Sequence, residues 1–243
     1  MNNFWYHYTT IIPKLLNGVS VTLEITFFAV LIGIGIGMFM ALGKMSKHLW
    51  LKIPANIYIE CLRGTPLFVQ IFLFHYGVSA VVKEMIGAPF AFKVMTTAIV
   101  VCGLNSGAYV AEIFRAGIQS VDRGQMEAAR SLGMSHGKAM LYVVLPQAFK
   151  QAIPPLGNEF VILLKDTSLL AAIGATEIMK IGQIYTSVNF APFPTYLGVA
   201  TVYLVLTFVI TRFVNWTERK LNAGDNHLQT KTRTKRRKGA AKV

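Results

Sequence analysis

The stretch from Glu127 to Pro146 decides the fold of the chain. It reads Glu127-Ala128-Ala129, three residues, Gly133, nine residues, and then Val143-Val144-Leu145-Pro146. The stretch is polar and amphipathic, yet it lies between two long apolar segments. A polar helical insert between membrane spans must face water, because lipid cannot satisfy its polar groups. The sequence therefore predicts a membrane protein with a structured loop in the aqueous phase.

Composition supports the membrane class. The 243 residues are 53% hydrophobic and only 14% charged, with a mean hydropathy of +0.49, whereas a soluble globular protein carries about 25% charged residues. The formal net charge of +13 could indicate nucleic-acid binding, but much of it lies in the tail at 231–238, so we expect no nucleic-acid partner. Cys61 and Cys102 lie in apolar segments without metal-ligand spacing, and we expect no metal site.

Five segments are long and apolar enough to cross a bilayer, which takes about 20 helical residues. They are residues 17–42, 55–78, 92–115, 154–175 and 195–216. The predicted fold is an all-α integral membrane domain over residues 1–222, with five transmembrane helices and a cytoplasmic helical hairpin at 122–146. The basic segment 223–243 is predicted to be a disordered cytoplasmic tail. Glycine runs in the first and third spans predict close helix packing.

The distribution of Lys and Arg predicts the orientation. Most of the 24 basic residues lie in the loop at 43–54, the loop at 115–153 and the region from Arg212 onward. Because cytoplasmic loops carry an excess of Lys and Arg, we expect the N-terminus outside, and the Glu127 loop and the C-terminus in the cytoplasm. Five spans place the two ends on opposite sides, which agrees with the charge pattern.

Local signals predict a helix, a sharp turn and a second helix within the loop. Asp122 is a plausible N-cap with Gln125 three residues later, a capping-box arrangement. Gly133 fits a left-handed C-cap, Ser135 can begin the second helix, and Pro146 ends that helix or begins the next element. Shape alone leaves two interpretations open, a rigid contact for a partner protein or an amphipathic hairpin on the membrane surface.

The chain offers no convincing nucleotide-binding loop. The nearest approach to G-x-x-x-x-G-K-[ST] runs from Gly37 to Met45, but it has five residues between the glycines and Met in place of Ser or Thr. We therefore expect the chain not to be an enzyme.

The loop resembles the E-A-A, G, I-x-L-P loop of inner-membrane subunits of ABC importers, with Val143 in place of Ile. Other strings are similar to the polar-amino-acid permease family, which serves histidine, arginine, glutamine, glutamate and cystine uptake. They are Glu60-Cys-Leu-Arg-Gly-Thr-Pro-Leu67, Asn105-Ser-Gly-Ala-Tyr-Val-Ala-Glu-Ile-Phe-Arg-Ala-Gly-Ile118, Asp122-Arg-Gly-Gln125 and Lys165-Asp-Thr-Ser-Leu169. The resemblance covers approximately residues 15–222.

The resemblance implies the type I ABC importer permease fold in the bacterial inner membrane. It implies four kinds of partner: two ATPase subunits, a second permease copy or a related permease, an extracytoplasmic amino-acid-binding protein, and the amino-acid substrate. ATP and Mg would bind the ATPase subunits, which leaves this chain without a cofactor. Six loop residues would dock onto the ATPase: Glu127, Ala128, Ala129, Gly133, Leu145 and Pro146. ATP binding and hydrolysis would drive alternating access.

Polar residues inside membrane spans are candidates for function. Glu60 and Arg63 can pair on one helix face, either as a structural pair or as part of a substrate path that Gly64 and Pro66 open by loosening the helix. Asn105 and Ser106 can face a pathway or join helices, and Glu112 and Arg115 favour a structural pair.

The fourth span carries a polar stripe, on which Glu159 and Asp166 can share a face that contacts substrate. The candidate pathway residues are Glu60, Arg63, Gln70, Asn105, Ser106, Asn158, Glu159, Asp166 and Ser168.

The main alternative is an ion-coupled secondary transporter of small polar solutes. Such a protein needs no docking hairpin, and inverted repeats are expected in it, but no clear repeat is visible here. The acidic span residues permit a cationic amino acid, but they do not exclude glutamine or cystine.

Overall fold

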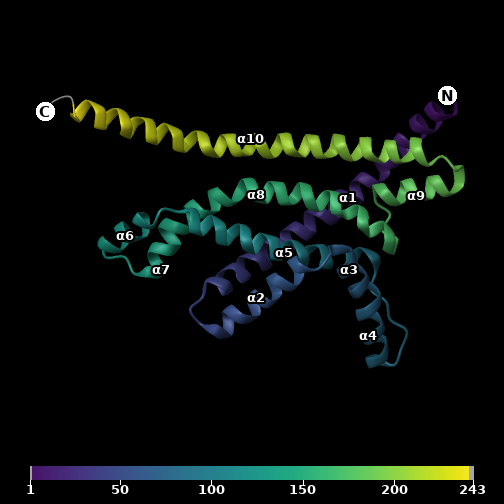
Figure 1. The fold of residues 1–243 in the computed structure, drawn as a ribbon, viewed down its shortest axis with the longest axis horizontal. Coiled ribbons are helices and arrows are strands. Elements are labelled where there is room, and N and C mark those ends of the chain that lie inside the picture. The colour runs from purple at the N-terminus through teal and green to yellow at the C-terminus, as the bar shows by residue number, and fades with distance from the viewer. Residues whose placement is uncertain (1, 241–243) are drawn as a thin grey trace.

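The computed structural model describes residues 2–240, and within them all regular secondary structure is helical (Figure 1). The elements are α1 Asn2–Met45, α2 Leu49–Gly64, α3 Leu67–Phe72, the π-helix η1 Leu73–Val78, α4 Ser79–Ile86, α5 Val94–Ser120, α6 Arg123–Ser131, α7 His136–Ala139, the π-helix η2 Met140–Val144, α8 Leu145–Asp166, the 3₁₀ helix η3 Thr167–Ile173, α9 Ile178–Asn189 and α10 Pro192–Ala240. The predicted all-α class is confirmed.

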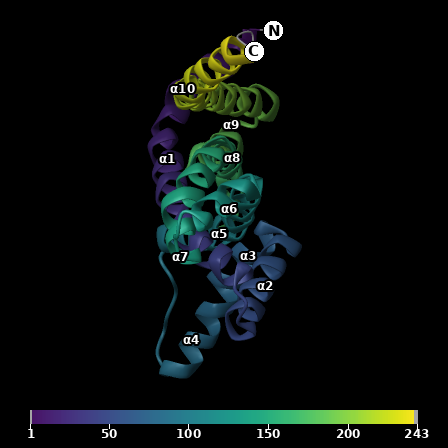
Figure 2. The ribbon, with the colours of Figure 1, turned by 90° about the vertical axis from the view of Figure 1, so that its left-hand side faces the viewer.

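Helix α5 is the centre of the fold. It packs along α1 on one side and against α8 on another, and α10 lies beside α1 and α8 (Figures 1 and 2). Glycines permit this contact: a Cβ at Gly37 would lie 2.6 Å from a methyl carbon of Val110, and one at Gly103 would lie 2.9 Å from Ile32. The predicted close packing through glycines is therefore confirmed.

Four helical segments in the described residues are long and apolar enough to cross a membrane. They are Asn3–Met45, Leu67–Ile86, Val94–Ser120 and Pro192–Lys220. The fifth predicted span, 154–175, corresponds to the end of α8 and to η3, and it is not among the four. Its charged residues and prolines lower its hydropathy, and it packs on α5.

The second predicted span, 55–78, was wrong as one continuous helix. Helix α2 ends at Gly64, and Thr65 and Pro66 are extended before α3 begins at Leu67. The cause is Pro66, which has no amide proton to donate to the carbonyl of Leu62, four residues earlier. The expected opening at Gly64 and Pro66 is therefore a complete break.

Side-chain amides supply the donors that the break removes. Gln70 Nε2 donates to the carbonyl of Leu62 at 2.8 Å and to the carbonyl of Thr65 at 3.0 Å. Asn105 Nδ2 on α5 donates to Gln70 Oε1 at 2.9 Å, so the same pair of amides attaches the break to α5. Non-helical backbone at membrane depth is tolerated where it is buried in protein or lines a water-filled cavity, and here side-chain donors also satisfy its carbonyls.

Different elements lie at the two ends of the molecule. The α6–α7 hairpin and the C-terminal end of α10 lie at one end, and the N-terminus and α9 lie at the other (Figure 1). Helix α9, which the sequence did not predict, begins at Ile178 and has Glu177 as its N-cap. This fully buried carboxylate accepts hydrogen bonds from the amides of Met179 and Lys180 and from the Tyr203 hydroxyl on α10.

The C-terminal segment differs from its prediction. The backbone of residues 223–240 continues α10, whereas the sequence predicted a disordered tail over 223–243. Its Lys and Arg residues favour a helix, whereas the Thr, Gly, Asp and Asn residues among them do not. Residues 241–243 lie outside the described part of the chain.

The break gives a testable stability prediction. Replacing Gln70 by Leu should lower stability by about 1–3 kcal/mol. The Thr65 carbonyl loses its side-chain donor, and the Leu62 carbonyl keeps only the longer hydrogen bond from Asn105 Nδ2 at 3.4 Å. The melting temperature of the purified chain in mild detergent measures this. Gln151→Leu makes the same chemical change at an exposed position of α8 and should have little effect; equal melting temperatures for both variants would contradict the role of Gln70.

Candidate functional site

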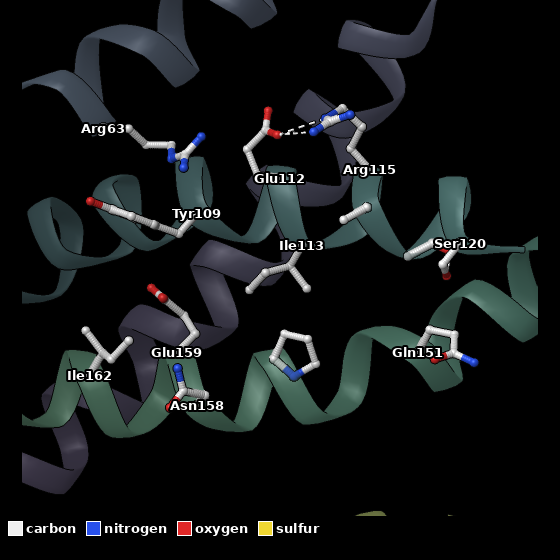
Figure 3. Close-up of a pocket in the computed structure, with 13 residues that line it drawn as sticks. Arg63, Tyr109, Glu112, Ile113, Arg115, Ser120, Gln151, Asn158, Glu159 and Ile162 are labelled. Carbon is white, nitrogen blue, oxygen red and sulfur yellow. Dashed lines mark hydrogen bonds and ion pairs between the residues drawn. The ribbon is translucent and has the colours of Figure 1, made fainter. Parts of the chain in front are cut away.

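Two adjoining cavities lie between the α2–α3 break, α5 and α8. The first has a volume of about 570 Å³ and the second of about 550 Å³. The first is lined by Arg63, Tyr109, Glu112, Ile113, Arg115, Ala116, Gly117, Ser120, Gln151, Pro155, Asn158, Glu159 and Ile162 (Figure 3). The second is lined by Arg63, Gly64, Thr65, Pro66, Leu67, Asn105, Tyr109, Glu159, Ile162, Leu163, Asp166 and Leu169. Four lining residues are shared, so the cavities form one path along α8.

Glu159 lies where the two cavities meet. Only 6% of this residue is exposed, and its carboxylate points from α8 toward Tyr109 on α5 (Figure 3). Arg63 lies beyond Tyr109, with its guanidinium 5.4 Å from the centre of the Tyr109 ring. A buried carboxylate and a guanidinium thus flank one aromatic ring, an arrangement that offers both signs of charge to a ligand.

Asp166 adds a second carboxylate to the path. It is seven residues after Glu159, which places it about 10 Å further along the same face of α8. Both residues line the second cavity, so the predicted shared face is confirmed. An amino acid carries an ammonium and a carboxylate, and the acidic pair and Arg63 are complementary to these two groups.

An ion-pair network lies at the edge of the first cavity. Glu112 accepts from Lys44 Nζ at 2.5 Å and from Arg115 at 2.8 Å. Arg115 also donates to Gln119 at 2.6 Å. The predicted Glu112–Arg115 pair is confirmed, and Lys44 attaches the end of α1 to it, a contact the sequence did not indicate because 67 residues separate the two positions.

The remaining pathway candidates fall into three groups. Asn158 lines the first cavity, and Asn105 lines the second while its amide bonds to Gln70. Three candidates line neither cavity: Gln70, Ser106 and Ser168. Ser106 is fully buried where Gly33 of α1 contacts α5, which agrees with the helix-joining alternative.

Glu60 is separate from the path. It is exposed and lines neither cavity. In the part of the chain whose side chains are described, no ion pair joins it to Arg63, so the anticipated Glu60–Arg63 pair is absent there. The reason is that Arg63 stacks on Tyr109 of α5 instead. Sequence reasoning did not select Tyr109, although its place in the string Asn105–Ile118 was a signal.

The hairpin has the predicted helix–turn–helix form. Asp122 caps α6 by accepting from the amide of Gly124 at 2.7 Å. The capping box does not form, because Gln125 accepts from Gln147 on α8 instead. The turn has Gly133 at a φ of +86°, a left-handed conformation that favours glycine. The amide of Met134 bonds to the carbonyl of Ala129, and that of Gly133 to the carbonyl of Arg130, which is a Schellman C-cap.

The second half of the hairpin continues into α8. Ser135 caps α7, which passes through η2 into α8 with right-handed helical dihedrals at each junction. The turn widens to a π-helix just before Pro146, which cannot donate to the carbonyl of Tyr142. Residues 136–166 therefore form one helical rod of about 45 Å. It joins the hairpin directly to Glu159 and Asp166.

The hairpin has a buried seam and an exposed face. Ala129 and Ala139 are buried, and their small side chains let α6 approach α7 and η2. Glu127 and Ala128 are exposed, together with several large apolar side chains: Leu132 at 85%, Leu141 at 55% and Tyr142 at 67%. Exposed apolar groups of this kind, within a polar segment, are typical of a protein contact surface.

The described side chains contain no group of three or more His, Cys, Asp or Glu positioned to hold a metal ion. Charged and hydrogen-bonding side chains line both cavities.

Comparison with known proteins identifies the family. Residues 33–223 match the family described as binding-protein-dependent transport system inner membrane component. The chain belongs to this family. It is 38% identical over 218 residues to the probable amino-acid permease protein YxeN of Bacillus subtilis, covering 90% of this chain and 96% of that protein. It is 34% identical over 210 residues to the glutamine transport system permease protein GlnP of Escherichia coli, covering 86% and 94%.

A solved structure gives the same result. The crystal structure of an amino acid ABC transporter with histidines matches with a TM-score of 0.79 at 42% identity, covering 86% of this chain and 94% of that one. The resemblance to the polar-amino-acid ABC permeases and the type I importer permease fold are both confirmed.

The ion-pair network gives a prediction. Glu112→Gln should lower stability by about 1 kcal/mol, because the carboxylate shared by Lys44 and Arg115 loses its charge. Salt screens such pairs. Raising the salt concentration should therefore lower the melting temperature of the wild type more than that of the variant. Glu60→Gln is the matched control; a wild type and a Glu112→Gln variant with the same salt dependence would contradict the network.

Proposed function

We propose that this chain is the transmembrane subunit of an ATP-driven importer and carries a polar amino acid across the bacterial inner membrane by alternating access. The observation that carries the proposal is the unbroken helical rod from the hairpin to the two cavity carboxylates, Glu159 and Asp166. The two relatives, a probable amino-acid permease and a glutamine permease, support the same class of substrate.

The cavities suggest how the substrate is held. Arg63 binds the substrate carboxylate, and Glu159 with Asp166 binds the ammonium group or a cationic side chain. Tyr109 and Ile162 supply the apolar part of the wall. Two acidic groups for one arginine favour a cationic amino acid, because burying the acids is costly unless they are paired.

The hairpin is the proposed contact for the motor. Glu127, Ala128 and Gly133 are exposed, and Leu145 and Pro146 form the junction with α8. Two separate ATPase subunits bind ATP and Mg, and their closure displaces the hairpin. A helix transmits such a displacement because its backbone hydrogen bonds run along its axis, so the rod moves Glu159 and Asp166 relative to α5. Pro154 and Pro155, within α8, each withdraw a backbone donor and supply a place to bend.

The proposed assembly also contains a second permease copy or a related permease and an external amino-acid-binding protein. The proposed orientation has the hairpin and the C-terminus in the cytoplasm and the N-terminus outside. Its support is the excess of Lys and Arg in segments 43–54, 115–153 and from Arg212 onward. The hairpin and the C-terminal end of α10 lie together at one end (Figure 1).

Reconstitution tests the function directly. The chain is co-expressed with the ATPase and binding protein encoded beside its gene, and uptake of labelled arginine, histidine, glutamine and cystine into proteoliposomes is measured with and without ATP. Uptake should require ATP and the ATPase subunit. Uptake that persists without the ATPase and follows an ion gradient would favour the alternative, a secondary transporter.

The hairpin gives a coupling prediction. Gly133→Val forces a β-branched side chain into a left-handed conformation, at a cost of about 1–2 kcal/mol, and so deforms the turn. ATP hydrolysis should continue while uptake falls at least about tenfold, because the deformed hairpin no longer positions α8 correctly. Gly137→Val is the matched control, because a Cβ at Gly137 meets open space and its φ is not left-handed. If the amount of substrate taken up per ATP hydrolysed were equal in the two variants, the hairpin would not be the element that couples hydrolysis to transport.

The cavity gives a transport prediction. Glu159→Gln and Asp166→Asn keep side-chain shape and remove charge, so the complex should assemble while the KM for uptake rises about tenfold or more, the loss expected for a charged hydrogen bond of about 1.5–3 kcal/mol. Glu60→Gln removes a charge outside the cavities and should leave uptake kinetics unchanged. Unchanged kinetics in both cavity variants would remove these carboxylates from the substrate path.

A further inference from the structure

A third hollow lies on the face where α1, α8 and α10 meet. Its volume is about 460 Å³, and it is lined by Leu23 and Val30 from α1, Phe160 from α8, and Ile210 and Phe213 from α10, among others. Thr217 is the one residue with a polar side chain among the described residues that line it. Residues of the transport cavities are absent from its lining, so this groove is a separate site.

The groove has the length of one lipid leaflet. Its lining on α1 extends from Leu23 to Ile34, eleven residues apart, which corresponds to about 16 Å along a helix. Half of the hydrocarbon core of a bilayer is about 15 Å. An almost wholly apolar groove of this length matches a single acyl chain lying along the helices.

Two lysines lie beyond one end of the groove. Lys150 precedes the lining residue Ile153 by three positions on α8, and Lys220 follows Thr217 by three positions on α10. Residues three apart share a helix face, so each lysine continues the groove face of its helix. Helix α8 begins, and the apolar part of α10 ends, toward the hairpin end of the molecule (Figure 1), which brings both lysines to that end.

Trp216 marks the level of the membrane surface at this end. It is 51% exposed, and the ammonium of Lys220 lies 4.0 Å from the centre of its ring. Tryptophan is enriched at membrane–water interfaces, and lysines near helix ends reach toward the headgroups. The positive end of the groove is thus at headgroup depth.

We propose that this groove binds one acyl chain of an anionic phospholipid from the leaflet on the hairpin side, with the headgroup phosphate held by Lys150 and Lys220. Lipid seated there covers the junction at which α10 packs on α1 and α8.

Native mass spectrometry of the purified full-length chain tests the site. The delipidated protein is titrated with dioleoyl-phosphatidylglycerol and, separately, with dioleoyl-phosphatidylcholine. The wild type should bind one phosphatidylglycerol more tightly than phosphatidylcholine. Lys150→Gln with Lys220→Gln should weaken the first phosphatidylglycerol about 30-fold, because each lysine near an anionic headgroup contributes a factor of about five, and should leave phosphatidylcholine binding nearly unchanged.

The control is Lys47→Gln with Lys52→Gln, which removes two exposed lysines from the α1–α2 region. It should keep the preference for phosphatidylglycerol. An unchanged affinity in the Lys150/Lys220 variant, or an equal loss in the control, would overturn the proposal, since general attraction between the basic protein and the anionic lipid would then account for binding.

A second variant tests the groove itself. Ile210→Phe fills it and should weaken both lipids, with the elution volume and melting temperature of the protein checking that it folds. If it does not fold, the exposed lysine variants decide. Ile210→Cys in a background without Cys61 and Cys102 tests the other occupant. A disulfide between two copies formed in membranes would show a second copy over the groove and overturn the lipid assignment, whereas absence of that disulfide supports it.

Discussion

The missing amide proton of Pro66 is the constraint on which the centre of the structure depends. Within a membrane, the carbonyl that Pro66 leaves without a donor cannot turn to water. Gln70 and Asn105 supply the donors, and so the chain can break between α2 and α3 beside α5. The break exposes Gly64, Thr65 and Pro66 to the second cavity. A continuous second span would have filled this wall with side chains and left less room for a ligand.

The same chemistry recurs along α8 with a different outcome. Pro146 is accommodated by a π-helical turn, and Pro154 and Pro155 lie within a helix that continues to Asp166. Proline therefore interrupts the helix where amides from α3 and α5 replace its donor, and only widens or loosens it elsewhere. One rod thus carries the hairpin at one end and two carboxylates at the other, an arrangement suited to transmitting movement to a binding site.

Small residues set the distances between these parts. Glycines bring α1 against α5, and Ala129 and Ala139 close the hairpin. Without a hydrophobic driving force between helices in lipid, close contact of this kind is a main source of association. An apolar groove lies along the junction of α1, α8 and α10, and an acyl chain is the proposed occupant of that groove.

The sequence by itself determined the local features, because these depend on neighbouring residues. The membrane class, the hairpin with its caps at Asp122 and Ser135 and its turn at Gly133, and the shared face of Glu159 and Asp166 all follow from composition, dihedral preference and helical spacing. The tertiary structure alone decided the pairings between distant positions: Gln70 with Asn105, Lys44 with Glu112, and Arg63 with Tyr109 instead of Glu60. No helical periodicity encodes these contacts, since each depends on how α1, α2 and α3 pack around α5.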